Sequence, residues 1–277
     1  MFTFRSMSQT ALLVLATGMA AFEARATGDS GSEQAFFLEL PVVLTASRLT
    51  QPLDESPNAM TVIDQQMIRA SGFRKLSELF RLVPGMYVGS RNGYSGFVSY
   101  HGTTDDFARR MQVLVDGRSV YLPPFSSVTW DNIPVLLEDI ERIEVIRGPS
   151  AASHGANSTQ GVINIITREA GVPEPGRVTV AQGGNGVSDL SAQFGVHGDS
   201  LDQRIGIGYR ADQGFDWSLV NDNNRTRMLN WRGNYHPNGV DNFDIQFGYS
   251  AAVRADGVAN RADNPFRDTR SEYSYQQ

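Results

Sequence analysis

Three features of this sequence could support catalysis or the binding of a phosphate or metal ion: a Gly/Ser-rich segment (the bridge), four histidines and a few carboxylates. The bridge, "GPSAASHGANSTQG", resembles a phosphate-binding loop only superficially, because neither Gly148 nor Gly155 is followed by the lysine that such loops use. Motifs of the G-x-S-x-G, H-E-x-x-H and G-x-G-x-x-G types do not occur. The histidines lack metal-ligand spacing and stand at His101, His154, His197 and His236.

The carboxylate clusters have ordinary explanations. Asp105–Asp106 is typical of a solvated turn, and Glu138, Asp139 and Glu141 are typical of one helix face. We therefore do not expect an enzyme, a metal site or a bound cofactor.

The first 26 residues have the layout of a secretory signal peptide. Arg5 precedes an apolar run from Ala11 to Ala21, and Ala24-Arg25-Ala26 fits a cleavage site of small residues. The run is too short for a membrane-spanning helix. A buried N-terminal helix is the alternative, and the signal-peptide interpretation predicts an exported protein whose mature chain starts at Thr27.

Charge and cysteine content narrow the class of protein further. The 277 residues include 24 basic and 30 acidic ones, for a net charge of −6, which becomes −7 once Arg5, Arg25 and Glu23 are removed. Such a charge gives no support to nucleic-acid binding. The chain has no cysteine, so disulfides and thiolate metal sites are excluded.

Residues 27–55 read as a polar lead followed by a short β-prone segment. "TGDSGSEQ" is typical of a flexible stretch, and "FFLELPVVLTASR" is extended around Val42 and Val43. Pro41 bars a central strand but is tolerated at an edge. Such a segment could add itself to another protein's sheet, although the residues alone favour an ordinary edge strand.

Residues 56–170 predict a compact α+β domain. We expect strands at "AMTVID", "EVIRG" and "GVINIIT", and a hairpin around Asp116-Gly117. Helical spacing predicts helices in "QQMIRASG", "FRKLSELFRLVPG" and "IPVLLEDIERI". Both faces of Gly161–Thr167 are mostly apolar, so this strand should be central in its sheet and form the core together with Arg142–Ile146.

After the Pro/Gly-rich break "EAGVPEPG", residues 177–277 alternate with a period of two. Ile205, Ile207 and Tyr209 fall on one strand face, and Arg204, Gly206 and Gly208 fall on the other. About five such strands follow one another, with aromatic residues on the apolar face. This succession fits the lipid-out, water-in pattern of an outer-membrane barrel, with a soluble β-sandwich as the alternative.

The sequence from Leu114 to Thr167, "LVDGRSVYLPPFSSVTWDNIPVLLEDIERIEVIRGPSAASHGANSTQGVINIIT", resembles the plug domain of TonB-dependent outer-membrane receptors. The upstream "LTASR…SPNAMTVIDQQMIRASGFRKLSELFRLVPGMYV" resembles the start of that domain, and the branch of colicin I receptor-like siderophore transporters is the most similar. The sequence departs from that pattern at His154 and His101, where an aromatic residue and an arginine are usual.

The resemblance implies a plug inside a β-barrel that imports a scarce ligand, such as an iron-siderophore, in the outer membrane of a Gram-negative bacterium. A TonB box would lie at Glu39, Leu40, Pro41, Val42, Val43, Leu44, Thr45 and Ala46. Ligand contacts would come from outward loops, at Arg91, Asn92, Tyr94, Tyr121, Phe125 and Trp130, or these residues pack against the barrel rim. The small residues of the bridge would let the plug lie close against the barrel wall.

The fold predicted for the chain is thus an α+β plug domain followed by the start of a transmembrane antiparallel β-barrel. The stretch after Gly171 has room for about five strands of 9–11 residues, too few to close such a barrel, and an open edge in lipid leaves backbone groups unsatisfied. We therefore expect a truncated N-terminal portion of a receptor. A non-transporting plug that binds TonB, a receptor for cobalamin or haem, and a passive porin-like channel are the alternatives.

Overall fold

The computed structural model describes most of the chain, in segments separated by gaps: residues 42–43, 51–52, 59–102, 109–122, 127–155, 157–171, 176–215, 221–238, 240–256 and 267–276. The predicted signal peptide lies outside the described residues. Within the described part, no helix is long and apolar enough to cross a membrane.

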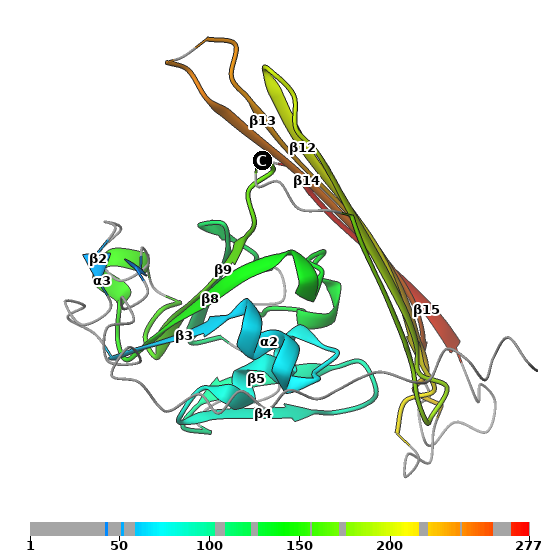
Figure 1. The fold of residues 1–277 in the computed structure, drawn as a ribbon. Coiled ribbons are helices and arrows are strands. Elements are labelled where there is room, and N and C mark those ends of the chain that lie inside the picture. The colour runs from blue at the N-terminus through cyan, green and yellow to red at the C-terminus, as the bar shows by residue number, and fades with distance from the viewer. Residues whose placement is uncertain are drawn as a thin grey trace, which may run out of the picture. The chain divides into compact units, whose positions relative to one another are not determined.

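Residues 59–171 form an α+β domain around a five-stranded sheet (Figure 1). In spatial order its strands are β3 (Ala59–Asp64), β8 (Ile140–Arg147), β9 (Gly161–Thr167), β6 (Met111–Val115) and β7 (Arg118–Ser119). Strand β9 pairs antiparallel with β8 and parallel with β6. It is central, as its apolar faces predict, and Val162, Ile163 and Ile165 are fully buried.

The first predicted helix is confirmed as α2 (Gln65–Ser71), and its ends have clear chemical causes. The Asp64 carboxylate accepts a hydrogen bond from the Met67 backbone N–H at 2.7 Å, which caps the start of the helix. Gly72 ends it in the left-handed conformation, with φ 66°.

The other two helix predictions are wrong in part. The stretch after Phe73 forms a 3₁₀ helix, η3 (Leu76–Leu82), whose start is fixed by the Glu78 carboxylate accepting from the Arg74 and Lys75 backbone N–H groups at 3.1 Å. "IPVLLEDIERI" contains only the short turn η6 (Leu137–Asp139), because β8 begins at Ile140 and its residues pair with β9.

Two hairpins complete the domain. Strands β4 (Met86–Ser90) and β5 (Gly96–Tyr100) pair with each other, and the predicted Asp116-Gly117 turn joins β6 to β7 with φ 48° and 78°. A further 3₁₀ turn, η5 (Trp130–Asn132), follows β7.

The bridge between β8 and β9 contains a short helical turn, α3 (Ala151–His154), and several local hydrogen bonds. The Ser158 backbone N–H donates to the Gly155 carbonyl at 3.2 Å, and the Ser150 backbone N–H donates to the Ser158 carbonyl at 2.9 Å. A Cβ atom added at Gly161 would lie 2.4 Å from the Ile146 carbonyl oxygen. The small residue there thus allows the two core strands to approach.

Residues 177–276 form a second sheet, in which neighbouring strands follow sequence order and are antiparallel. We call it the meander sheet. Its strands are β10 (Arg177–Gln182), β11 (Ser188–Val196), β12 (Leu201–Asp212), β13 (Asn224–Tyr235), β14 (Phe243–Asp256) and β15 (Arg267–Gln276). The alternating pattern predicts about five strands here, in the stretches that form β10 to β14, and the structure adds β15.

The meander sheet exposes apolar side chains on one face and buries polar ones on the other. The exposed apolar residues include Val178, Val180, Leu190, Phe194, Ile205, Ile207, Phe243 and Ile245. Strands β12, β13 and β14 are long neighbours in this sheet (Figure 1). This polarity is the reverse of that of the α+β domain.

Candidate functional site

The polar face of the meander sheet meets the α+β domain. Its buried polar residues are Gln193, Asp202, Asp212, Asn224, Thr226, Asn234, Gln246, Ser250 and Arg254. The contacts of this face with the α+β domain fall into two groups along the strands. We call the end where the chain passes from β9 to β10 the junction end, and the opposite end, with the β12–β13 connection, the far end.

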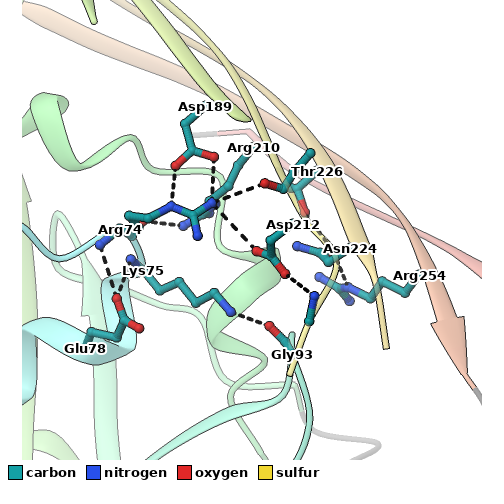
Figure 2. Close-up of polar contacts among 12 residues, drawn as sticks. Arg74, Lys75, Glu78, Gly93, Asp189, Arg210, Asp212, Asn224, Thr226 and Arg254 are labelled. Carbon is teal, nitrogen blue, oxygen red and sulfur yellow. Dashed lines mark hydrogen bonds and ion pairs between the residues drawn. The ribbon is translucent and has the colours of Figure 1, made fainter. Parts of the chain in front are cut away.

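At the far end, Arg74 forms a two-pronged ion pair with the sheet (Figure 2). Its Nε and Nη2 atoms donate to the Asp189 carboxylate at 2.6 and 2.7 Å, and Asp212 lies 3.7 Å from Nη2. The Arg210 guanidinium in turn donates to the Arg74 carbonyl at 2.6 Å. The hydrogen bond to Asp189 raises the pKa of Arg74 further above its ordinary value, so this contact remains charged.

Gly93, in the β4–β5 loop, is held by hydrogen bonds to both the α+β domain and the meander sheet. Its carbonyl accepts from the Lys75 ammonium (Figure 2), and its N–H donates to the buried Asp222 carboxylate at 2.6 Å. A Cβ atom there would lie 2.6 Å from both the Asp222 carbonyl oxygen and the Gly214 Cα. Only glycine permits this approach of the loop to the β12–β13 connection.

Beside Gly93 lies a cavity of about 130 Å³. The Arg254 guanidinium lies over the Tyr94 ring, 5.1 Å from its centroid, and donates to the Asn132 side-chain oxygen at 2.6 Å. The cavity is lined by both parts of the structure, through Arg91, Tyr94, Ser95, Gly96, Ser127, Val128, Thr129, Trp130, Asp131 and Arg254.

The cavity brings together three of the residues that the sequence analysis predicts as ligand contacts: Arg91, Tyr94 and Trp130. Asn92 instead shapes the loop, because its side-chain oxygen accepts from the Tyr94 and Ser95 backbone N–H groups at 3.1 and 2.7 Å.

Trp130 lines the cavity but is largely buried in the core. It is only 3% exposed and packs against Phe80 with ring centroids 5.0 Å apart. Tyr121 packs beside the core, and Phe125 lies outside the described residues. A ligand role for these residues remains a prediction.

Of the predicted TonB box, the structure describes Val42 and Val43 alone. They form the short strand β1, which pairs antiparallel with β2 (Gln51–Pro52). The other residues of the predicted box lie outside the described residues: Glu39, Leu40, Pro41, Leu44, Thr45 and Ala46.

At the junction end, the buried Asp139 carboxylate contacts the sheet. Arg204 forms an ion pair with it, and the Asn230 amide donates to it at 3.2 Å. Burial raises the pKa of Asp139 above its ordinary value, while Arg204 acts in the opposite direction. Cβ atoms added at Gly206 and Gly208 would lie 2.7 Å from Asp139 Oδ2 and 2.4 Å from a Leu136 methyl group.

The end of β9 is fixed by a second set of contacts. The Arg232 guanidinium donates to the Thr167 and Arg168 carbonyls at 2.9 and 3.1 Å and pairs with Asp244 at 2.7 Å. The Thr167 hydroxyl and backbone N–H donate to Asp116 at 2.6 and 2.8 Å. Burial raises the pKa of Asp116, which the bonds from Thr167 oppose.

The sequence analysis missed the residues of the meander sheet that build this interface: Asp189, Arg204, Asp222, Arg232 and Arg254. The sequence feature that could have indicated them is the polar face of the alternating strands. That pattern predicts a face turned toward water, but it does not predict which residues of the α+β domain this face contacts. The prediction that close approach depends on the small residues of the bridge also missed Gly206 and Gly208, which allow that approach from the sheet side.

Comparison with known proteins identifies the class. Residues 52–162 match the family model described as the TonB-dependent Receptor Plug Domain. The chain therefore carries the plug domain of the TonB-dependent receptors, followed by strands of their barrel. These receptors are Gram-negative outer-membrane proteins, which places the chain in the outer membrane.

Two relatives show the range of the class. The chain is 31% identical over 180 residues to a vitamin B12 transporter, BtuB, of Vibrio vulnificus, covering 63% of this chain and 28% of that protein. It is 29% identical over 237 residues to an iron-regulated outer membrane virulence protein of Vibrio cholerae, covering 80% of this chain and 35% of that protein. The chain thus spans about a third or less of the length of these relatives.

Solved structures support the fold. The pyoverdine outer membrane receptor FpvA of Pseudomonas aeruginosa superposes with a TM-score of 0.65 at 18% identity, covering 83% of this chain and 32% of that one. The ferric-catecholate import receptor Fiu of E. coli gives a TM-score of 0.59 at 20% identity, covering 75% of this chain and 29% of that one.

Proposed function

We propose that the protein takes part in energy-coupled uptake of a scarce ligand across the outer membrane, and that the ligand is a ferric siderophore. One observation carries the proposal: a plug-domain sequence over residues 52–162 lies against a sheet that buries polar and exposes apolar side chains. That combination suits a barrel wall with lipid outside and a plug inside. The role is transport, and we assign no enzymatic step.

The cavity at the far end supports an anionic, aromatic ligand. Its lining contains the cations Arg91 and Arg254 and one carboxylate, Asp131, beside the Tyr94 and Trp130 rings. Among the described residues, the buried Trp130 indole N–H has no hydrogen-bond partner. A ferric catecholate would supply negative charge, aromatic faces and oxygen acceptors for such groups.

The coupling partner we propose is TonB, and the contact would be the predicted box from Glu39 to Ala46. A β-prone segment can add to an exposed sheet edge of a partner, where main-chain hydrogen bonds supply the affinity. Within the box, Val42 and Val43 already adopt an extended backbone, paired with β2. Release from β2 would free the same backbone groups for TonB.

The test of coupling is Val43→Pro, with Val43→Ile as the matched control. Proline removes a main-chain donor that strand addition requires, whereas isoleucine keeps both the donor and the β propensity. We expect Val43→Pro to retain surface binding of a radiolabelled ferric tris-catecholate while its uptake falls to that of a strain lacking TonB. Uptake that persists without TonB would instead indicate a passive channel.

Cobalamin is the second ligand candidate, because relatives at 30–31% identity are vitamin B12 transporters. Competition between ferric tris-catecholate and cyanocobalamin for the same cells distinguishes the two. Binding of neither probe, together with binding to TonB, would favour a plug that occupies TonB without transport.

A further inference from the structure

The cavity is assembled from both parts of the structure. Arg91 and Tyr94 come from the β4–β5 loop, and Trp130 and Asp131 come from η5, whereas Arg254 comes from β14. The shape of the cavity therefore depends on what holds the loop and η5 against the meander sheet.

The first holding contact is at the loop backbone. Asp222 is 3% exposed, and its carboxylate accepts from the Gly93 N–H at 2.6 Å and from the Phe215 N–H at 3.1 Å. One buried carboxylate thus joins the β4–β5 loop to the β12–β13 connection. Hydrogen bonds to a charged acceptor are stronger than neutral ones, and a buried carboxylate that loses a donor is costly.

The second holding contact is Arg254, which is 6% exposed. Its guanidinium donates to the Asn224 side-chain oxygen at 3.2 Å within the sheet and to the Asn132 side-chain oxygen at 2.6 Å across the interface. The same group lies over the Tyr94 ring. Arg254 therefore fixes both sides of the cavity, the loop through Tyr94 and η5 through Asn132.

We propose that Asp222 and Arg254 are positioning residues of the cavity, which exists only while the Gly93 loop is docked on the β12–β13 connection. The identity of the ligand in this inference rests on the proposed function. The docking of the loop does not, because it follows from the hydrogen bonds of Asp222 and Arg254. A ligand that touches both Tyr94 and Arg254 binds the docked loop preferentially. Ligand binding and loop docking then strengthen each other, because such coupling is reciprocal.

The test is hydrogen exchange of the full protein in detergent, without ligand, for Asp222→Ala, Asp222→Asn and the control Asp199→Ala. Asp199 is an exposed aspartate in the connection between β11 and β12, at the opposite end. We expect the backbone amides from Gly93 to Gly96 to exchange much faster in Asp222→Ala, and less so in Asp222→Asn, which keeps an acceptor. The control should match the wild type.

The amides of β8 and β9 serve as the internal reference. Unchanged protection there, with faster exchange at Gly93, identifies a local loss of docking. If Asp222→Ala also loosens β8 and β9, then Asp222→Asn, which preserves side-chain volume, decides the question. Wild-type protection of Gly93 in both variants would overturn the proposal.

A ligand titration then separates this inference from the proposed function. We expect ferric tris-catecholate to slow Gly93 exchange in the wild type, and Asp222→Ala to bind it at least about fivefold more weakly, the lower end of typical coupling between two sites. Faster exchange with unchanged affinity would refute the positioning role while leaving the transport function intact. If neither ferric tris-catecholate nor cyanocobalamin binds the wild type, the proposed ligand class is wrong. The docking of the Gly93 loop is then tested by the hydrogen-exchange result alone.

Discussion

The two sheets of this chain place their apolar side chains in opposite environments. In β9, Val162, Ile163 and Ile165 are fully buried, whereas on the meander sheet Ile207 is 46% exposed and Val180 is 65% exposed. Polar residues show the converse, because Thr226 of β13 is fully buried. One chain therefore contains a sheet whose apolar side chains form a buried core and a sheet whose apolar side chains lie on the outer face, as in a barrel wall that contacts lipid.

The difference teaches what the period-two pattern does and does not specify. Alternation fixes which residues share a face, but the surroundings decide which face is covered. Here the polar face is covered by another domain of the same chain, and the apolar face matches the band that barrel strands present to lipid.

The largest effect is expected in the core of the α+β domain. Ile163→Ala removes a fully buried side chain from the central strand, so it should lower the free energy of unfolding by about 2–5 kcal/mol. Urea unfolding of the protein in detergent micelles measures this. Val180→Ala is the matched control on the exposed face, where a change within about 0.5 kcal/mol is typical of surface sites. Equal losses at the two sites would break the comparison.

A charge on the apolar face of the meander sheet should have the next largest effect, and only in lipid. Ile207→Arg should destabilise the membrane-inserted state by about 2–4 kcal/mol if the residue lies near the bilayer midplane. Folding into phospholipid vesicles, followed by gel mobility, measures the loss. Ile207→Leu should insert normally, and normal insertion of the arginine variant would contradict a lipid-facing surface.

The contact at the junction end predicts a pH dependence. Burial raises the pKa of Asp139, so the folded state binds the proton more tightly than the unfolded state does. The stabilisation from this group is present below the ordinary aspartate pKa of about 3.9 and is lost as the pH rises through the raised value. Each tenfold difference in proton affinity between the folded and unfolded states corresponds to about 1.4 kcal/mol of stability.

Asp139→Asn should remove that dependence, because asparagine does not titrate. Unfolding measured at several mildly acidic pH values checks this, as the wild type should lose stability with rising pH more steeply than the variant does. Parallel profiles would show that Asp139 titrates normally.

The smallest effect is expected at the end of α2. Gly72 has φ 66° and no neighbouring atom within 4 Å of an added Cβ, so Gly72→Ala meets only backbone strain. We expect a loss of about 1 kcal/mol, within the range for a left-handed non-glycine residue. Gln66→Ala, at an exposed position of the same helix, provides a reference, and a stabilised Gly72→Ala would refute the assigned cap geometry.

The sequence predicted the elements whose cause is local. Strands β3, β8 and β9 follow apolar β-branched runs, and the turn at Asp116-Gly117 follows from residues that tolerate positive φ. Strand β15 was not predicted, because "RDTRSEYSYQ" has little alternation of apolar and polar residues. It forms by pairing with β14, which the local sequence does not reveal.

The contacts that build the cavity could not be predicted in the same way. Gly93 and Asp222 are 129 positions apart, and no local pattern links a loop glycine to a carboxylate at that separation. Arg91 and Tyr94 were found because the resemblance pointed to the loop. Arg254 was not, because its role depends on the strand that faces that loop.

The most direct test of the two opposed polarities uses the absence of native cysteine. Single cysteines at Ile207, on the exposed face, and at Asn230, on the face that contacts Asp139, would carry a small fluorescent label in vesicles containing brominated phospholipid. We predict strong quenching of the label at position 207 and little at position 230. Equal quenching at both positions would contradict a sheet with lipid on one side and the α+β domain on the other.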